Sequence, residues 1–151
     1  MGHIHASIEL INSTDLEMAR RGQLDKDEVR RVHVEAMVDT GAFHMVINET
    51  IQQILQIPVV GKKISYLANG DRIECDHVFP LEIRFENRTA HCDAIVLPGD
   101  NVEPLLGAIP LEHMDVLIDP VRQRLLVNPA HPDFAILNLR TVFRKREFEN
   151  L

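Results

Sequence analysis

An aspartate stands at the end of an apolar segment, where a carboxylate is a candidate for catalysis. The segment reads Ala-Met-Val-Asp-Thr-Gly-Ala over residues 36–42, so Asp39 leaves the edge of the core and its ionisation depends on desolvation and on its neighbours. Gly41 lets backbone N–H groups approach that carboxylate, and the Thr40 hydroxyl can join one loop to another. Asp, Thr and Gly are also common turn residues, so a plain turn is the alternative.

The eight histidines and two cysteines raise the question of a metal site. None of them has the spacing of a known structural zinc site. We therefore expect exposed histidines, two buried or half-buried free thiols and no metal. The residues concerned are His3, His5, Cys75, His77, His91 and Cys92.

Composition narrows the class of protein further. The 151 residues, 45% of them apolar and 26% charged, indicate one globular domain with a single core. A net charge of −7 without a basic stripe argues against nucleic acid as a partner. No apolar run reaches the roughly 20 residues that span a bilayer, and the first residues lack the pattern of a secretion signal. These features predict a cytoplasmic protein without a membrane partner.

Alternation of apolar and polar residues dominates the chain and predicts β-strands. Asn48 is placed to cap a helix that ends before Pro58, whereas residues 12–22 predict a loop or a short helical turn. Asn69-Gly70 between two alternating runs predicts a hairpin with a tight turn, because this pair tolerates positive φ. The predicted strands are residues 3–11, 29–38, 63–68, 71–77, 78–85, 89–97, 105–106, 116–118 and 124–127, and the predicted helices are residues 48–56 and 110–113.

These elements favour an all-β barrel or sandwich with small helical additions. We expect residues 1–128 to form this domain and residues 129–151 to form a C-terminal extension. The extension combines apolar residues with a mixed-charge end that includes Arg144-Lys145-Arg146. An ordered segment of this kind lies against its own domain or against a partner subunit.

The segment around Asp39 resembles the active-site motif of retropepsin-like (retroviral-type) aspartic proteases, in which two hydrophobic residues precede Asp-Thr-Gly-Ala. Two further family features follow in the expected order. Residues 64–74 resemble the β-hairpin flap, and Leu105-Leu106-Gly107 resembles the late apolar pair followed by glycine. The resemblance covers residues 28–128 and is to the small bacterial-type members of the family.

The resemblance implies a closed β-barrel with one lobe per chain and a catalytic role for Asp39. In this family two such carboxylates share a proton and activate a water that attacks a peptide carbonyl. The resemblance also implies that the enzyme needs no cofactor and that its flap closes over the substrate. The active-site loop would be supported by Thr40, Gly41 and Ala42, and the flap would carry Tyr66, Ala68, Asn69 and Gly70.

The chemistry needs two aspartates, and the chain has one such motif. Asp119, the other aspartate at a strand end, is followed by Pro120 instead of Thr and Gly. We therefore expect the second Asp39 to come from a second copy of the chain, in a homodimer that cleaves polypeptides as an aspartic endopeptidase.

Phe43 departs from the family pattern, because relatives usually carry Ser, Thr or Asp after Asp-Thr-Gly-Ala. A bulky aromatic side chain removes a polar group that would support the loop or hold the substrate backbone, and it would instead line an apolar subsite. The alternative function is therefore a catalytically silent domain that serves for dimerisation or peptide binding.

Overall fold

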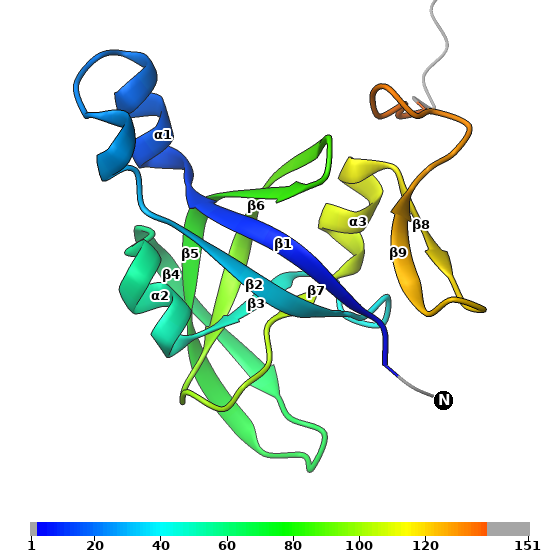
Figure 1. Ribbon diagram of the computed structural model, residues 1–151. Coiled ribbons are helices and arrows are strands. Elements are labelled where there is room, and N and C mark those ends of the chain that lie inside the picture. Colours follow the sequence, from blue (N-terminus) through cyan, green and yellow to red (C-terminus); the bar gives the residue numbers. More distant parts are fainter. Residues whose placement is uncertain (1–2, 139–151) are drawn as a thin grey trace, which may run out of the picture.

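The computed structural model describes residues 3–138, and the centre of this part of the chain is one twisted seven-stranded sheet (Figure 1). The first strand pairs antiparallel with both the second and the fifth, while the fourth strand lies at an edge. A separate hairpin, β8 (Val116–Asp119) and β9 (Arg124–Val127), packs beyond the sheet. The order in the sheet is β1 (His5–Asn12), β2 (Arg31–Val38), β7 (Leu105–Leu106), β3 (Met45–Asn48), β6 (Arg88–Leu97), β5 (Arg72–Phe85) and β4 (Val59–Tyr66).

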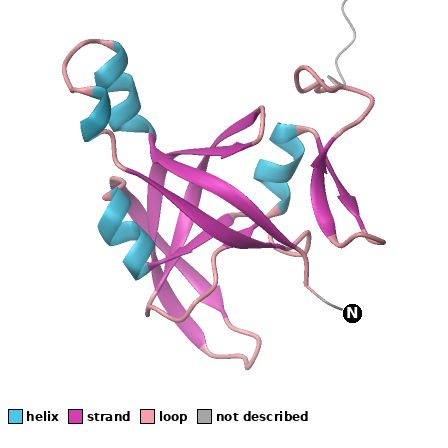
Figure 2. Cartoon of the chain, in the orientation of Figure 1, coloured by secondary structure: helices cyan, strands magenta, loops and turns pink. Residues whose placement is uncertain are grey.

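Short helices lie around the outside of the sheet (Figure 2). They are α1 (Ser13–Arg20), the 3-10 helix Lys26–Glu28, α2 (Glu49–Leu55) and α3 (Ala108–Met114). The predicted cap of α2 is confirmed, because the Asn48 side chain accepts a hydrogen bond of 2.8 Å from the backbone N–H of Ile51. The segment predicted as a loop or helical turn is the helix α1, which Asn12 caps in the same way. None of the helices described is long and apolar enough to cross a membrane.

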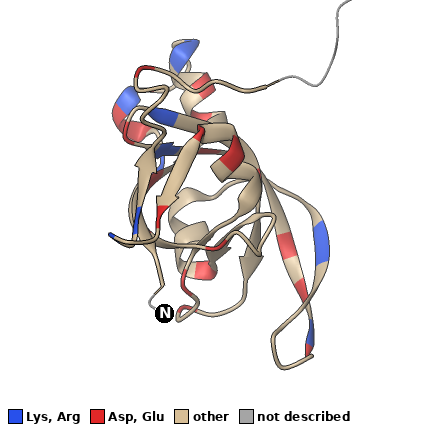
Figure 3. Ribbon diagram, turned by 90° about the vertical axis from the view of Figure 1, so that its right-hand side faces the viewer, with Lys and Arg blue, Asp and Glu red and all other residues tan. Residues whose placement is uncertain are grey.

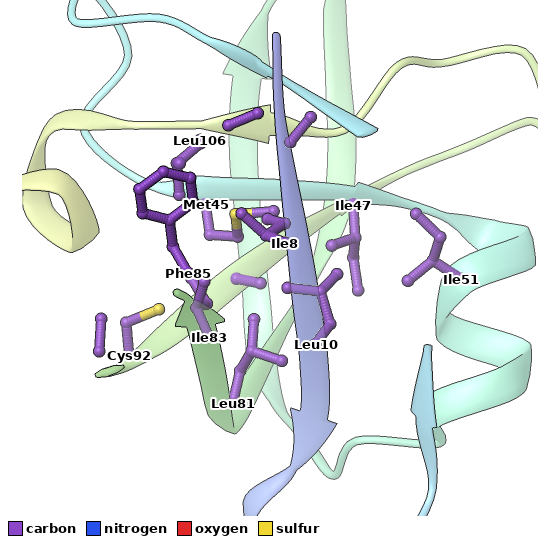
Figure 4. Packing of buried hydrophobic residues seen from close by; sticks show 14 of the residues in the cluster. Ile8, Leu10, Met45, Ile47, Ile51, Leu81, Ile83, Phe85, Cys92 and Leu106 are labelled. Atoms are coloured by element: carbon purple, nitrogen blue, oxygen red, sulfur yellow. The ribbon is translucent and has the colours of Figure 1, made fainter. Parts of the chain in front are cut away.

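The predicted class, all-β with small helical additions, is confirmed. The core lies inside the curved sheet, where side chains from β1, β3, β5 and β6 meet (Figure 4). In β1 and β6 buried and exposed residues alternate along much of the strand, which is why the period-two pattern of the sequence identified them. The inward side chains that are fully buried include Leu10, Met45, Ile47, Leu81, Ile83 and Leu106.

Basic and acidic residues are interspersed along the described part of the chain (Figure 3). The hairpin of β4 and β5 carries both basic and acidic residues, and Lys62 forms an ion pair with Asp76. The surface therefore offers no continuous basic stripe along this hairpin, in line with the acidic composition.

The turn of the β4–β5 hairpin differs from the prediction. Strand pairing ends where Tyr66 faces Arg72, and the loop is then closed by a hydrogen bond of 2.8 Å from the Leu67 N–H to the Asp71 carbonyl. Within this loop only Gly70 has a positive φ, +87°. The prediction of a two-residue Asn-Gly turn is therefore wrong, and the loop consists of residues 68–70. The Asn69 side chain instead accepts a 3.0 Å hydrogen bond from the Asp71 N–H.

The two strands predicted over residues 71–77 and 78–85 are one continuous strand, β5. The pairing of β5 with β6 shifts register between Val78 and Leu81, where Pro80 has no N–H to donate. The irregularity bends the strand without ending it. As a result, one strand connects the hairpin tip to the centre of the core.

The first part of the predicted C-terminal extension, up to residue 138, is bonded to its own domain, and residues 139–151 lie outside the described part. Asp115, which ends α3, accepts hydrogen bonds from Asn128 Nδ2 at 3.0 Å and from the Ile136 N–H at 3.0 Å. Nδ1 of His131 lies 2.6 Å from the same carboxylate. These contacts, with the Ile136 N–H first among them, lower the pKa of Asp115 to about 2.

Because the pKa of Asp115 is lowered in the folded state, we expect the free energy of unfolding to decrease in acid. Because its pKa is lowered by folding, its contribution is complete above pH 4, declines as the pH falls toward the folded value of about 2, and is absent below it. We expect Asp115→Asn to lower the urea midpoint at pH 7 and to match the wild type at pH 2. Asp133→Asn, on the same segment, is the matched control and should follow the wild type throughout. Parallel curves for Asp115→Asn and the wild type across this range would contradict the prediction.

Candidate active site

The loop that carries Asp39, residues 39–44, connects β2 to β3. The short strand β7 lies between these two strands, pairing parallel with β2 and antiparallel with β3. Directly after β2, the Asp39 N–H donates a 3.1 Å hydrogen bond to the Leu106 carbonyl. Leu105 and Leu106 thus hold the base of the loop, although they are distant from Asp39 along the chain.

Gly107 and the start of α3 hold the other end of the loop. A Cβ at Gly107 would lie 2.3 Å from the His44 carbonyl oxygen and 2.9 Å from that of Ala42, so only glycine fits this approach. Its φ of −85° can be adopted by any residue. Glycine is therefore required here by the close approach of the two carbonyl oxygens and not by the backbone conformation. The N–H groups of Ala108 and Ile109 donate to the carbonyls of Ala42 and Phe43 at 2.7 and 3.0 Å.

The Asp39 carboxylate is half-buried, and its two oxygens differ. Oδ1 accepts a 2.9 Å hydrogen bond from the Gly41 N–H, and a Cβ on Gly41 would lie 3.1 Å from this oxygen. Oδ2 has no hydrogen-bond partner within residues 3–138. One oxygen is therefore oriented by the loop while the other is free to accept or donate a proton.

The flap residues are placed apart from this loop. Tyr66 is 73% exposed, Ala68, Asn69 and Gly70 are also exposed, and the hairpin tip projects beyond the body of the sheet (Figure 1). No hydrogen bond or ion pair of the described residues joins this tip to residues 39–44. A single chain thus brings Leu105-Leu106-Gly107 to Asp39 and leaves the predicted flap open.

The structure also brings together three residues that the sequence did not single out as a group. Asp93, on β6, is hydrogen-bonded to Nε2 of His77 on β5, and its Oδ1 lies 3.5 Å from Nδ1 of His44. His44 is the last residue of the Asp39 loop. Only the register of β5 against β6 places His77 near Asp93, and no local pattern in the sequence indicates it.

The described residues form no group of three or more His, Cys, Asp or Glu that could hold a metal ion. Cys75 and Cys92 are free and buried, as expected from the sequence. Burial raises the pKa of the Cys92 thiol to about 12, which makes it a poor nucleophile. His77 departs from the expectation of exposed histidines, because its side chain is only 19% exposed.

Comparison with known proteins agrees with this geometry. The family model described as "gag-polyprotein putative aspartyl protease" matches residues 26–113, more than half of the chain and the whole stretch from Asp39 to Gly107. The chain belongs to this family. The resemblance to retroviral-type aspartyl proteases, which the motif around Asp39 indicated, is therefore confirmed as family membership.

Among solved structures, this aspartyl protease family member is similar to the retroviral protease-like domain of Ddi1 from Leishmania major. The similarity covers 85% of this chain and 90% of that chain, with a TM-score of 0.56 and 15% sequence identity. At this identity the likeness concerns the fold. No curated protein matches the chain.

Proposed function

We propose that this chain is an aspartic endopeptidase whose active site forms in a homodimer, with Asp39 of each copy in the catalytic pair. The observation that carries the proposal is the state of the Asp39 carboxylate, which the Gly41 N–H orients through Oδ1 while Oδ2 stays free. Membership of the aspartyl protease family supports the same reaction. The substrate is an extended polypeptide, bound as a strand beneath the hairpin of β4 and β5.

The reaction uses two unequal carboxyl groups. Two carboxylates about 3 Å apart cannot both ionise, so one Asp39 is a base while the other keeps its proton. The ionised group takes a proton from water as the water oxygen attacks the peptide carbonyl carbon. The protonated group gives its proton to the carbonyl oxygen. The C–N bond then breaks as the nitrogen receives a proton from the pair.

A second copy is needed because the chain carries one Asp-Thr-Gly motif. Asp119 is already used within its hairpin, where its Oδ1 accepts 3.1 Å hydrogen bonds from the Val121 and Arg122 N–H groups. Its carboxylate therefore serves the turn that joins β8 and β9, and it is a poor candidate for the second catalytic group.

An apolar face next to the active-site loop supports the dimer. Apart from one Asp and one Arg at their ends, β8 and β9 carry only apolar side chains, and this hairpin faces the viewer in Figure 3. Leu117 is 45% exposed and Val121 89% exposed. A pocket of about 200 Å³ brings Thr40 next to Leu117 and Ile118, so a partner seated here would reach the Asp39 loop.

Three further points belong to the proposal. The protease domain is residues 1–128, followed by the extension of residues 129–151. The sheet is the closed barrel of the family, which the pairing of β1 with both β2 and β5 supports. The enzyme works in the cytoplasm without a cofactor and without binding nucleic acid or a membrane.

A catalytically silent module for dimerisation or peptide binding is the second candidate. Phe43 favours it, because its side chain, within the Asp39 loop, is 71% exposed and offers an apolar contact in place of a polar one. Such a module would keep the dimer and bind peptides without cleaving them.

A peptide-library digest at acid to neutral pH, followed by mass spectrometry of the new termini, tests the proposal. We expect cleavage whose specific activity falls on dilution, because dissociation of the dimer separates the two Asp39 carboxylates. A dimer that binds peptides and yields no new termini at any pH would favour the silent module.

A further inference from the structure

Asp93 occupies a position between two parts of the proposed active site. Its half-buried side chain, 28% exposed, projects from β6, and its two oxygens face histidines from different segments. Oδ2 is hydrogen-bonded to Nε2 of His77, on the strand that runs to the hairpin tip. Oδ1 faces Nδ1 of His44, which ends the Asp39 loop, at 3.5 Å.

The His44 side of this arrangement is only partly satisfied. Nδ1 of His44 is buried and makes no hydrogen bond, and Asp93 is its ion-pair partner at 3.5 Å. A buried polar atom without a hydrogen bond is costly, so a small shift of His44 toward Asp93 is favoured.

Within the described part of the chain, the Asp93–His44 ion pair connects a side chain of residues 39–44 to β6. The remaining links of this loop are backbone hydrogen bonds to β7 and α3. Through His77, the same carboxylate reaches β5 and thus the hairpin that would cover the substrate.

The charge of Asp93 is maintained by its surroundings. Burial would raise the pKa of this carboxyl group, but the hydrogen bond from His77 and the charges of His44 and His77 outweigh burial, so the pKa lies below its ordinary value. Asp93 is consequently ionised at neutral pH, where it shares a hydrogen bond with His77 and faces Nδ1 of His44 as an ion-pair partner.

We propose that Asp93 is a positioning residue, which joins His44 of the Asp39 loop to His77 of the flap strand so that the two halves of the site keep a fixed relation. This inference rests on the proposed function in so far as it concerns catalysis. The coupling itself, between the loop and the flap strand, is a property of the folded chain and is measured separately.

The test is a double-mutant cycle of Asp93→Asn and His77→Gln, read by amide hydrogen exchange and by kinetics. We expect His77→Gln, which does not touch the loop, to speed exchange at Gly41 and His44 about tenfold and to have no further effect when added to Asp93→Asn. Each single variant should lower kcat about tenfold to a hundredfold and change KM far less. The reason is that a shift of the loop displaces the Asp39 carboxylate, which takes part in the reaction.

Asp76→Asn is the matched control. This carboxylate is the neighbour of His77 on β5 and pairs with Lys62 on the hairpin, away from the loop. It should leave the exchange of Gly41 and His44 and the kcat unchanged. Unaltered loop exchange in His77→Gln, or additive effects of the two substitutions, would overturn the proposal. If the wild type cleaves no peptide, the proposed function fails and the exchange data alone decide the coupling.

Discussion

Substituting Asp39 by Asn is expected to lower kcat/KM for peptide hydrolysis by at least about a thousandfold. The amide keeps the shape of the side chain and can still accept the 2.9 Å hydrogen bond from the Gly41 N–H through its carbonyl oxygen. It can neither remove a proton from water nor hold the shared proton of the pair. The fold should survive, and the measurement is the rate of cleavage of a peptide found in the library digest.

Mixing the wild type with Asp39→Asn tests whether the active site needs two copies of the chain. If the dimer exchanges chains freely, equal amounts of wild type and Asp39→Asn leave about one quarter of the dimers with two intact carboxylates. Activity should fall to that share, whereas a monomeric enzyme would lose only half. Asp119→Asn, the other strand-end aspartate, is the control and should retain full activity. Cleavage that persists in Asp39→Asn would exclude the proposed mechanism.

Substituting Gly107 by Ala is expected to be the most destabilising single-methyl change in the described chain. The new Cβ would lie 2.3 Å from the His44 carbonyl oxygen and 2.9 Å from that of Ala42, both backbone atoms. The Ala42 carbonyl cannot move away without straining the hydrogen bond that it accepts from the Ala108 N–H, and the neighbouring Phe43 carbonyl is held in the same way by the Ile109 N–H. We expect a loss of more than about 3 kcal/mol in the free energy of unfolding, which is roughly 10 °C in Tm.

The matched control for this change is Gly61→Ala. Gly61 has open space where a Cβ would stand, and its φ is not in the positive region. Its substitution should alter the Tm by less than about 2 °C, because an unstrained Ala costs the folded state little and restricts the unfolded chain. Equal Tm values for the two variants, measured by thermal unfolding, would show that the close approach at Gly107 is not required.

Local patterns predicted much of the framework correctly. Asn48 capped α2, and the predicted bounds of β1, β2, β6, β7, β8 and β9 lie within two residues of the observed ones. β3 was not predicted, and β4 begins and ends earlier than its predicted bounds of residues 63–68. Each correctly predicted feature depends on residues within a few positions of one another, so the chain sequence contains the whole cause. The same holds for the helix α3, in whose first turn Pro110 is tolerated.

The errors occurred where a distant segment decided the outcome. The continuity of β5 past Pro80 depends on its pairing with β6, because the ladder continues on the far side of the shifted register. The turn at Gly70 depends on which residues of β4 and β5 face each other. The pairing stops at Tyr66 and Arg72, two residues earlier on β4 and one residue later on β5 than predicted. Spacing along the chain could not reveal either pairing partner.

By itself, the sequence determined that a carboxylate, a hydroxyl and a glycine follow one another at a strand end, once per chain, and this single copy is the reason to expect a dimer. Only the tertiary structure decided what holds that loop. β7 supports its base, Gly107 lets α3 approach its carbonyls, and Asp93 pairs with His44 at its end. The physical reason is that the reactive groups are set by which residues follow one another locally. The orientation of those groups depends on hydrogen bonds, charges and close packing between segments far apart in the chain.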